Sequence, residues 1–301
     1  LDELTEYVIE KDVENLLRKS HYEQLITLEK RISKHIGKDF TLTTNLGVLP
    51  IFIEVTERRN LFVHCNGIVS KNYIENCKKH NVENIDNVEI NNQLIVSPEY
   101  FNEAFQAIFE IGVKLGQVLW RKFLPKEIEN ADINLNNLCF ELIVSGYYDL
   151  ANVLLKFGTE VLPKKSSEKL RKTMIINKAL ATYLGGDKVK CNNILKSEDW
   201  TIGLHFPLGV AVLQENYSKA TELMIKIGPK DDDFDASSYQ EWPLFKVFRE
   251  TDEFKETFKK IFDKEFVVKD APEKSFIKLL NNIDQKKKVK LEEKIKKTVE
   301  N

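Results

Sequence analysis

One short stretch of this sequence combines residue types that could carry out acid–base and phosphate chemistry. Residues 57–64 read Glu-Arg-Arg-Asn-Leu-Phe-Val-His. A histidine can take or give a proton near neutral pH, and an arginine offers fixed positive charge and several hydrogen-bond donors to an anion. His64 and the two arginines are therefore the candidates for chemistry on a phosphate-containing substrate.

Helical geometry limits what these side chains can do within one copy of the chain. On an ideal α-helix Glu57, Asn60 and His64 fall in one narrow stripe. Arg59 lies about 140° from His64 round the helix, and Arg58 lies about 120° away in the other sense. One helix alone would make a poor site, whereas two facing copies would bring two arginines and two histidines to a shared cleft.

The pattern Arg59-Asn60-x-x-x-His64 resembles the signature of the HEPN superfamily (higher eukaryotes and prokaryotes nucleotide-binding). In that signature an arginine, often followed by a polar residue, stands four to six residues before a histidine. The wider string Glu-x-x-Glu-Arg-Arg-Asn-x-x-x-His, followed by Asn66 and Gly67, makes the match more specific. The resemblance covers about residues 1–125.

This resemblance implies a metal-independent endoribonuclease that works as a homodimer on single-stranded or looped RNA and leaves 2′,3′-cyclic phosphate ends. His64 would move a proton at the ribose 2′-hydroxyl or the leaving 5′-oxygen, and Arg59 would stabilise the growing charge on the phosphate. Asn60 would orient the phosphate or His64, and Glu57 would hold an arginine or the histidine. Arg58 is the substitute for Arg59, because both spacings satisfy the family pattern.

A non-catalytic reading of the same residues stays open. A histidine near a helix end beside arginines is commonly a solvent-facing or capping residue, and inactive members of the superfamily bind only a partner or a nucleotide. The alternative function is an adaptor that dimerises through its first domain and binds protein partners through its repeats. It predicts no RNA cleavage, with Arg59 or His64 held in structural hydrogen bonds.

Composition predicts an all-α protein. The chain has 301 residues, 42% of them hydrophobic and 31% charged, with only 12 glycines and 8 prolines, so residues that favour turns are sparse. The net charge of −2 gives no global attraction for RNA, so any such attraction must be local. No apolar run is long enough for a membrane span.

Metal and cofactor sites are not expected. The other histidines, His21, His35, His80 and His205, have no cysteine or carboxylate at a ligand spacing, and there is no glycine-rich phosphate loop. The four cysteines form no Cys-x-x-Cys pair, which favours reduced thiols in a cytoplasmic protein.

The first domain, residues 1–127, is expected to be a HEPN-like helical bundle. Helices are expected over 3–18 and 20–36, from Pro50 to Asn66-Gly67, after an N-capping Ser70, and from Ser97-Pro98-Glu99 to Phe123, with a brief strand over 88–95. Several apolar residues of the two longest helices are expected to be buried: Ile51, Val55, Phe62, Val63, Phe101, Phe105, Ile108, Val113 and Leu119.

The second domain, residues 134–268, shows a weak internal repeat. Turns at Gly146, Gly186 and Glu215 are each followed five positions later by a small residue and then by an apolar pair. This pattern resembles tetratricopeptide repeats and implies helical hairpins, whose extended surface could bind a protein regulator.

The last part of the chain is rich first in aromatic residues and then in lysines. An aromatic stripe from Trp242 to Phe262 is expected to form a core or capping face, and residues 269–301 are expected to form a lysine-rich helical tail. By analogy with the HEPN superfamily, bacterial anti-phage defence or a toxin–antitoxin system is the expected setting.

Overall fold

The computed structural model describes residues 2–36, 43–44, 46–162, 167–231 and 234–267, and the expected tail over 269–301 lies outside them. Over these residues the fold is all-α, as the composition predicts, and the only β-type pairing is an isolated bridge between Ile68 and Gln93. The chain divides into two compact units, Leu1–Leu119 and Trp120–Asn301. The division falls inside a long helix, a few residues before the boundary expected near residue 127.

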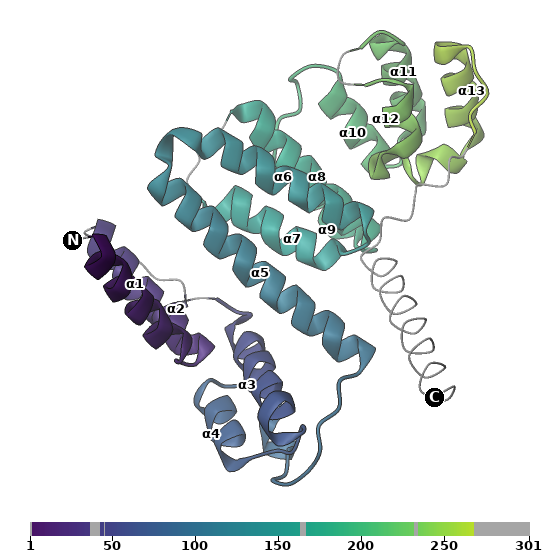
Figure 1. The fold of residues 1–301 in the computed structure, drawn as a ribbon. Coiled ribbons are helices and arrows are strands. Elements are labelled where there is room, and N and C mark those ends of the chain that lie inside the picture. Colours follow the sequence, from purple (N-terminus) through teal and green to yellow (C-terminus); the bar gives the residue numbers. More distant parts are fainter. Residues whose placement is uncertain (1, 37–42, 45, 163–166, 232–233, 268–301) are drawn as a thin grey trace, which may run out of the picture. The chain divides into compact units, whose positions relative to one another are not determined.

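The described residues of the first unit form four α-helices and most of a fifth (Figure 1). They are α1 (Asp2–Leu17), α2 (His21–Ile36), α3 (Leu49–Cys65), α4 (Lys71–Lys79) and α5 (Pro98–Phe123).

Local sequence signals account for the ends of α3 and α4. Pro50 occupies the first turn of α3, where its missing N–H costs nothing, and Asn66 ends the helix in the left-handed conformation with φ of 51°. Gly67 follows with φ of 76°. The Ser70 side chain accepts a hydrogen bond from the Tyr73 backbone N–H at 3.2 Å, so it caps α4 as predicted.

The predicted core face of α3 is wrong at its C-terminal end. Phe62 and Val63 are 38% and 55% exposed, and the buried positions are Ile53, Glu54 and Leu61. The Phe62 ring packs over Gly67 instead of entering the core, and a Cβ at Gly67 would lie only 2.9 Å from Phe62 Cε1. The end of α3 therefore presents apolar side chains at the surface.

Helix α5 begins at Pro98 and ends at Phe123, as predicted, but its large apolar residues are not fully buried as expected: Phe105, Val113 and Leu119 are half-buried, and two others are exposed. Phe101 and Ile108 are each 49% exposed, whereas Ala104 and Ala107 are buried. Ala104 lies about 40° from Ile108 round the helix, so on this side of α5 the small side chains are covered and the larger ones beside them are not.

No strand forms over 88–95 within the described residues, so that prediction is also wrong. The segment is held to the loop after α3 by three backbone hydrogen bonds: Val69 N to Asn92 O, Asn91 N to Val69 O, and Leu94 N to Gly67 O. Asn91 has φ of 70°, which interrupts an extended backbone and prevents a regular ladder.

The second unit consists of helical hairpins followed by shorter helices (Figure 1). The α-helices that start in this unit are α6 (Ile128–Val144), α7 (Tyr148–Lys156), α8 (Glu168–Leu184), α9 (Lys188–Lys196), α10 (His205–Leu213), α11 (Tyr217–Ile227), α12 (Ala236–Glu241) and α13 (Asp252–Phe262).

Three hairpins, α6–α7, α8–α9 and α10–α11, turn at the positions that the repeat marks. Gly146, Gly186 and Glu215 have positive φ values of 83°, 96° and 58°. The small residues five positions later, Ala151, Cys191 and Ala220, are fully buried. Close helix packing therefore explains the repeat in the sequence, and the tetratricopeptide assignment itself stays a prediction.

The aromatic stripe near the end of the unit is a core face. Phe245, Phe248, Phe254 and Phe258 are buried in one cluster, and Trp242 and Phe262 pack against it. Their rings contact one another at angles from 23° between Phe254 and Phe258 to 75° between Phe248 and Phe254.

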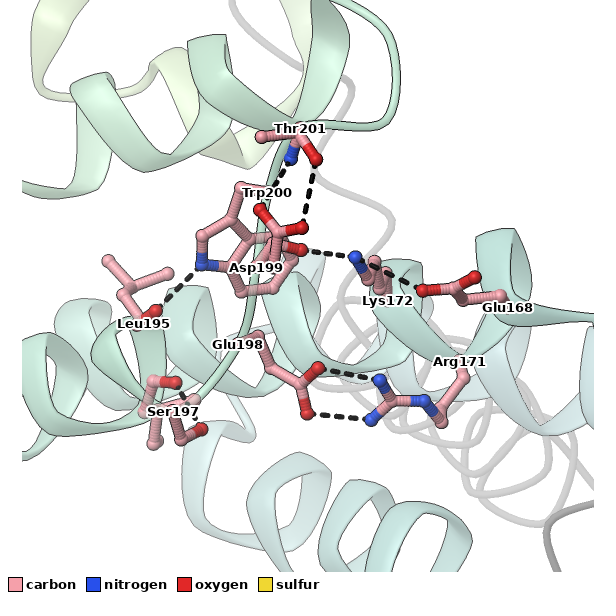
Figure 2. Close-up of polar contacts among 10 residues, drawn as sticks. Glu168, Arg171, Lys172, Leu195, Ser197, Glu198, Asp199, Trp200 and Thr201 are labelled. Carbon is pink, nitrogen blue, oxygen red and sulfur yellow. Dashed lines mark hydrogen bonds and ion pairs between the residues drawn. The ribbon is translucent and has the colours of Figure 1, made fainter.

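The connection between α9 and α10 is fixed to α8 by polar contacts (Figure 2). Arg171 Nη1 and Nη2 donate to the two carboxylate oxygens of Glu198 at 2.7 and 2.6 Å. The buried Lys172 donates through Nζ to the backbone carbonyl of Asp199, and Trp200 Nε1 donates to Leu195 O at 2.7 Å. This bonding fixes the start of the third hairpin relative to the second.

Candidate functional site

The two residues expected to be catalytic, Arg59 and His64, are both exposed on the second half of α3. Arg59 Nη1 donates to Asn60 Oδ1 at 3.2 Å. Across the parts of the chain that the structure describes, His64 has no hydrogen-bond or ion-pair partner. Both side chains can therefore meet a molecule from outside the chain.

Arg58, the substitute for Arg59, is in a different environment. Its Nε donates to Glu54 Oε1 at 2.6 Å and its Nη1 donates to the carbonyl of Ile95 at 3.3 Å. Its guanidinium carbon lies 3.9 Å from the centre of the Tyr100 ring. Only 18% of the Arg58 side chain is exposed, so all of its strong interactions are internal.

The carboxylate of Glu54 is the centre of this internal network. Besides Arg58, it accepts hydrogen bonds from Tyr73 Oη at 2.6 Å and from Tyr100 Oη at 2.8 Å. Burial raises the pKa of both tyrosines, and their hydrogen bonds to Glu54 raise it further. The two phenols are therefore fixed as donors to a buried carboxylate, which is a structural arrangement.

Glu57 and Asn60 differ in how they relate to the expected catalytic pair. Asn60 accepts the hydrogen bond from Arg59, so it can orient that guanidinium. Glu57 instead accepts from Asn76 Nδ2 on α4 at 3.2 Å, and this is the hydrogen bond that the structure gives it. Its expected role of holding an arginine or His64 is not seen within one copy.

A cleft of about 350 Å³ lies beside the first half of α3, but it does not contain the expected catalytic pair. Glu54, Arg58, Tyr73 and Tyr100 line it, together with the loop after α4. Neither Arg59 nor His64 is part of its wall. Within one copy, the expected catalytic residues lie on open surface.

The order of side chains round the end of α3 describes that surface. At 100° per residue, Arg59, Val63, Asn60 and His64 follow one another within an arc of about 140°. Val63 is 55% exposed, so an apolar side chain separates the arginine from the histidine. The strip therefore combines a guanidinium, an imidazole and an exposed apolar side chain on one open surface.

Of the two thiols near this strip, one is exposed and the other is buried, just as Arg59 is exposed and Arg58 is largely covered. Cys65 directly follows His64 and is an exposed free thiol, whereas Cys77 on α4 is fully buried. Burial raises the pKa of the Cys77 thiol to about 12, and the nearby carboxylates of Glu54 and Glu57 act in the same direction.

The described ranges contain neither a cluster of metal-ligating side chains nor a helix suited to a membrane. No three His, Cys, Asp or Glu side chains there gather as they would around a metal ion. No helix there combines the length and the apolar character that crossing a bilayer requires.

Comparison with known proteins adds no further assignment. No family model, curated protein or solved structure matches the chain.

The polar network around Glu54 was not predicted from the sequence. One signal was present, because Glu54 stands four residues before Arg58, the spacing at which an acid and a base pair on a helix. Tyr73 and Tyr100 come from other helices, and no spacing in the sequence joins them to Glu54.

Proposed function

We propose that the protein is a metal-independent endoribonuclease that cleaves single-stranded or looped RNA and leaves 2′,3′-cyclic phosphate ends. The proposal rests on the resemblance of residues 54–64 to the HEPN signature. One structural observation carries it further: Arg59 and His64 are exposed, while the neighbouring Arg58 is held in a buried network. An adaptor that held Arg59 or His64 in structural hydrogen bonds would present the opposite pattern.

The chemistry follows from the two side chains. His64 takes the proton from the ribose 2′-hydroxyl or gives one to the leaving 5′-oxygen, so the 2′-oxygen attacks the phosphorus and the 5′-oxygen leaves. Arg59 donates to the non-bridging phosphate oxygens, whose negative charge grows in the transition state. Asn60 holds Arg59 in place through their 3.2 Å hydrogen bond.

A second copy of the chain supplies the other half of the site in this proposal. Arg59 and His64 lie about 140° apart on their helix, too far round to grip one phosphate together. The exposed apolar residues at this end of the unit, including Phe62, Val63 and Ile95, provide a surface that a partner copy would cover. A composite cleft then contains both Arg59–His64 pairs.

The repeat unit serves regulation in this proposal. A ribonuclease has to be restrained in a healthy cell, and stacked hairpins present an extended surface for an inhibitor or a trigger. Anti-phage defence or a toxin–antitoxin system is the setting that the HEPN resemblance favours.

The test measures cleavage of a labelled single-stranded RNA by the purified full chain with EDTA present. His64→Ala is expected to lower the rate by about 10²–10⁴-fold, the usual contribution of a general acid or base. His35→Ala is the matched control, because His35 is exposed on α2, and it should keep the full rate. Mass spectrometry of the products should show 2′,3′-cyclic phosphate ends.

Cleavage that survives His64→Ala, or products that carry only other ends, would show that the proposed chemistry is wrong. Absence of cleavage by the wild-type dimer over a panel of RNAs would favour the adaptor. In that case the exposed surface of α3 would be tested for protein partners.

A further inference from the structure

The second unit contains a pocket that plays no part in the proposed ribonuclease chemistry. Its volume is about 510 Å³, within the range of small-molecule sites. Side chains of α6, α8 and α10 line it, and the segment from Phe234 to Leu244 forms a further wall. The contacts of Arg171 and Lys172 with the α9–α10 connection (Figure 2) hold two of these helices in position.

A glycine on the wall of this pocket has no local structural reason to be there. Gly209 lies inside α10, where glycine destabilises a helix by about 1 kcal/mol relative to alanine. A Cβ at this position would meet Ile176 and Leu244 at 3.7 Å, an ordinary contact, and the backbone is not left-handed. Because Gly209 belongs to the pocket wall, a side chain longer than that of alanine at this position would extend into the pocket.

Two carboxamides form a donor–acceptor edge in the pocket. Asn177 Nδ2 on α8 donates to Asn136 Oδ1 on α6 at 2.9 Å, and Asn177 is only 8% exposed. This bond leaves Asn136 Nδ2 as a donor and Asn177 Oδ1 as an acceptor, and neither atom has another partner in the described parts of the chain. A nucleobase edge presents the complementary pair, a ring nitrogen beside an amino or imino N–H.

Aromatic rings form another part of the wall. His205 stacks on Phe234 with an angle of 2° and 4.6 Å between ring centroids, and its Nε2 lies 2.9 Å from Asp231 Oδ1. Trp242 meets Phe234 edge to face at 4.9 Å, and Phe140 lies 6.3 Å from Trp242. Such surfaces bind planar bases by stacking.

The charge of the lining favours an anionic ligand. The chain has 47 acidic residues, yet no carboxylate side chain lines the pocket. Lys169 contributes a positive charge to the lining, and His205 is already paired with the carboxylate of Asp231. A ligand that combines a planar base with a phosphate would match the aromatic wall, the amide edge and this charge.

We propose that this pocket binds a mononucleotide unit. The base lies against the aromatic wall with its edge on Asn136 and Asn177, and the phosphate lies toward Lys169. The unit could come from a free nucleotide or from the end of an RNA chain. The inference does not depend on the ribonuclease proposal, since it concerns binding by other residues in another unit.

The experiment is isothermal titration calorimetry with the full chain. The four ribonucleoside monophosphates are titrated in one arm, and a single-stranded RNA hexanucleotide is titrated into the His64→Ala variant in the other. At least one mononucleotide or the hexanucleotide is expected to bind. The ligand that binds more tightly shows whether the pocket takes a free mononucleotide or the end of an RNA chain.

Matched variants locate the site. Gly209→Leu fills the pocket and should weaken binding at least about 10-fold, whereas Gly209→Ala adds only an ordinary contact and should bind within about threefold of wild type. Asn136→Ala should weaken binding about 10-fold, while Asn193→Ala, an exposed asparagine of α9 outside the pocket, should not.

Several results would overturn the proposal. These are no heat of binding with any nucleotide or with the RNA, binding that Gly209→Leu leaves unchanged while thermal unfolding shows the variant folded, or capture of peptides in place of nucleotides. If Gly209→Leu does not fold, Asn136→Ala alone decides, because it removes a side chain from the edge of the pocket without filling it.

Discussion

Two faces of α3 use similar side chains for opposite purposes. On one face, Glu54 pairs with the largely covered Arg58 and accepts hydrogen bonds from two tyrosine hydroxyls inside the unit. On another face, Arg59 and His64 point outward. Of two adjacent arginines, one is therefore held in an internal network and the other is open to solvent, and the difference comes from the direction in which each side chain points and from the helices nearby.

The largest expected effect on stability comes from removing the carboxylate at the centre of the Glu54 network. Glu54→Ala leaves Arg58 and two phenol hydroxyls without their acceptor in a place that water reaches poorly. Breaking a buried pair from one side costs about 3–5 kcal/mol. Hydrogen–deuterium exchange of the α3 and α4 amides in increasing urea should report this loss from the first unit.

Glu57→Ala is the matched control for that substitution. Glu57 is half-buried on the same helix and accepts one hydrogen bond from Asn76, so its removal should cost less than about 1 kcal/mol. Equal losses for the two variants would show that the Glu54 network does not hold the unit together.

A smaller effect is expected from a single hydroxyl of the network. Tyr73→Phe keeps the buried ring and removes one donor to Glu54, which should cost about 1–3 kcal/mol in the same exchange measurement. Tyr100→Phe should cost less, because Tyr100 is only half-buried whereas Tyr73 is 2% exposed. If Tyr100→Phe proves the more costly change, the burial argument is wrong.

The effect of burial on stability can also be compared by changing the pH, because one thiol of the first unit, Cys77, is buried and another, Cys65, is exposed. Burial raises the pKa of Cys77 from an ordinary 9.0 to about 12, so above pH 9 the unfolded chain loses this proton while the folded chain keeps it. Stability is therefore full below pH 9 and falls as the pH rises toward 12, by at most about 1.4 kcal/mol per pH unit from this group.

Cys77→Ala should flatten this alkaline loss in the first unit, and Cys65→Ala should leave the wild-type slope because Cys65 is exposed. Exchange of the α4 amides between pH 8 and 10, corrected for the intrinsic rate, measures both. An unchanged slope in Cys77→Ala would assign the loss to other groups, such as Tyr73.

The sequence predicted many local features because each depends on a few neighbouring residues. Pro50, Ser70, Asn66 and Gly67 act through caps and backbone conformation, and the structure places them as expected. The hairpin turns of the second unit could be predicted for the same reason, since a small residue at a fixed distance from a turn reports close helix packing.

The sequence does not show which other parts of the chain pack against each face of a helix, so the burial of individual side chains could not be predicted. Phe62 and Val63 fit the helical pattern of a core face, yet Phe62 packs over the turn at Gly67 and Val63 has no cover. The choice between Arg58 and Arg59 stayed open for the same reason. The guanidinium of Arg58 is covered by the ring of Tyr100, which lies on α5, far along the chain.

The contrast between the two arginines is tested most directly by substituting each and measuring both stability and RNA cleavage. Arg58→Ala should destabilise the first unit by about 3–5 kcal/mol, because it leaves the Glu54 carboxylate buried without its charged partner. Arg59→Ala should change stability by less than about 0.5 kcal/mol, as exposed substitutions usually do, and should abolish most RNA cleavage. An Arg59→Ala protein that cleaves RNA at the wild-type rate would contradict the assignment, as would an Arg58→Ala protein as stable as wild type.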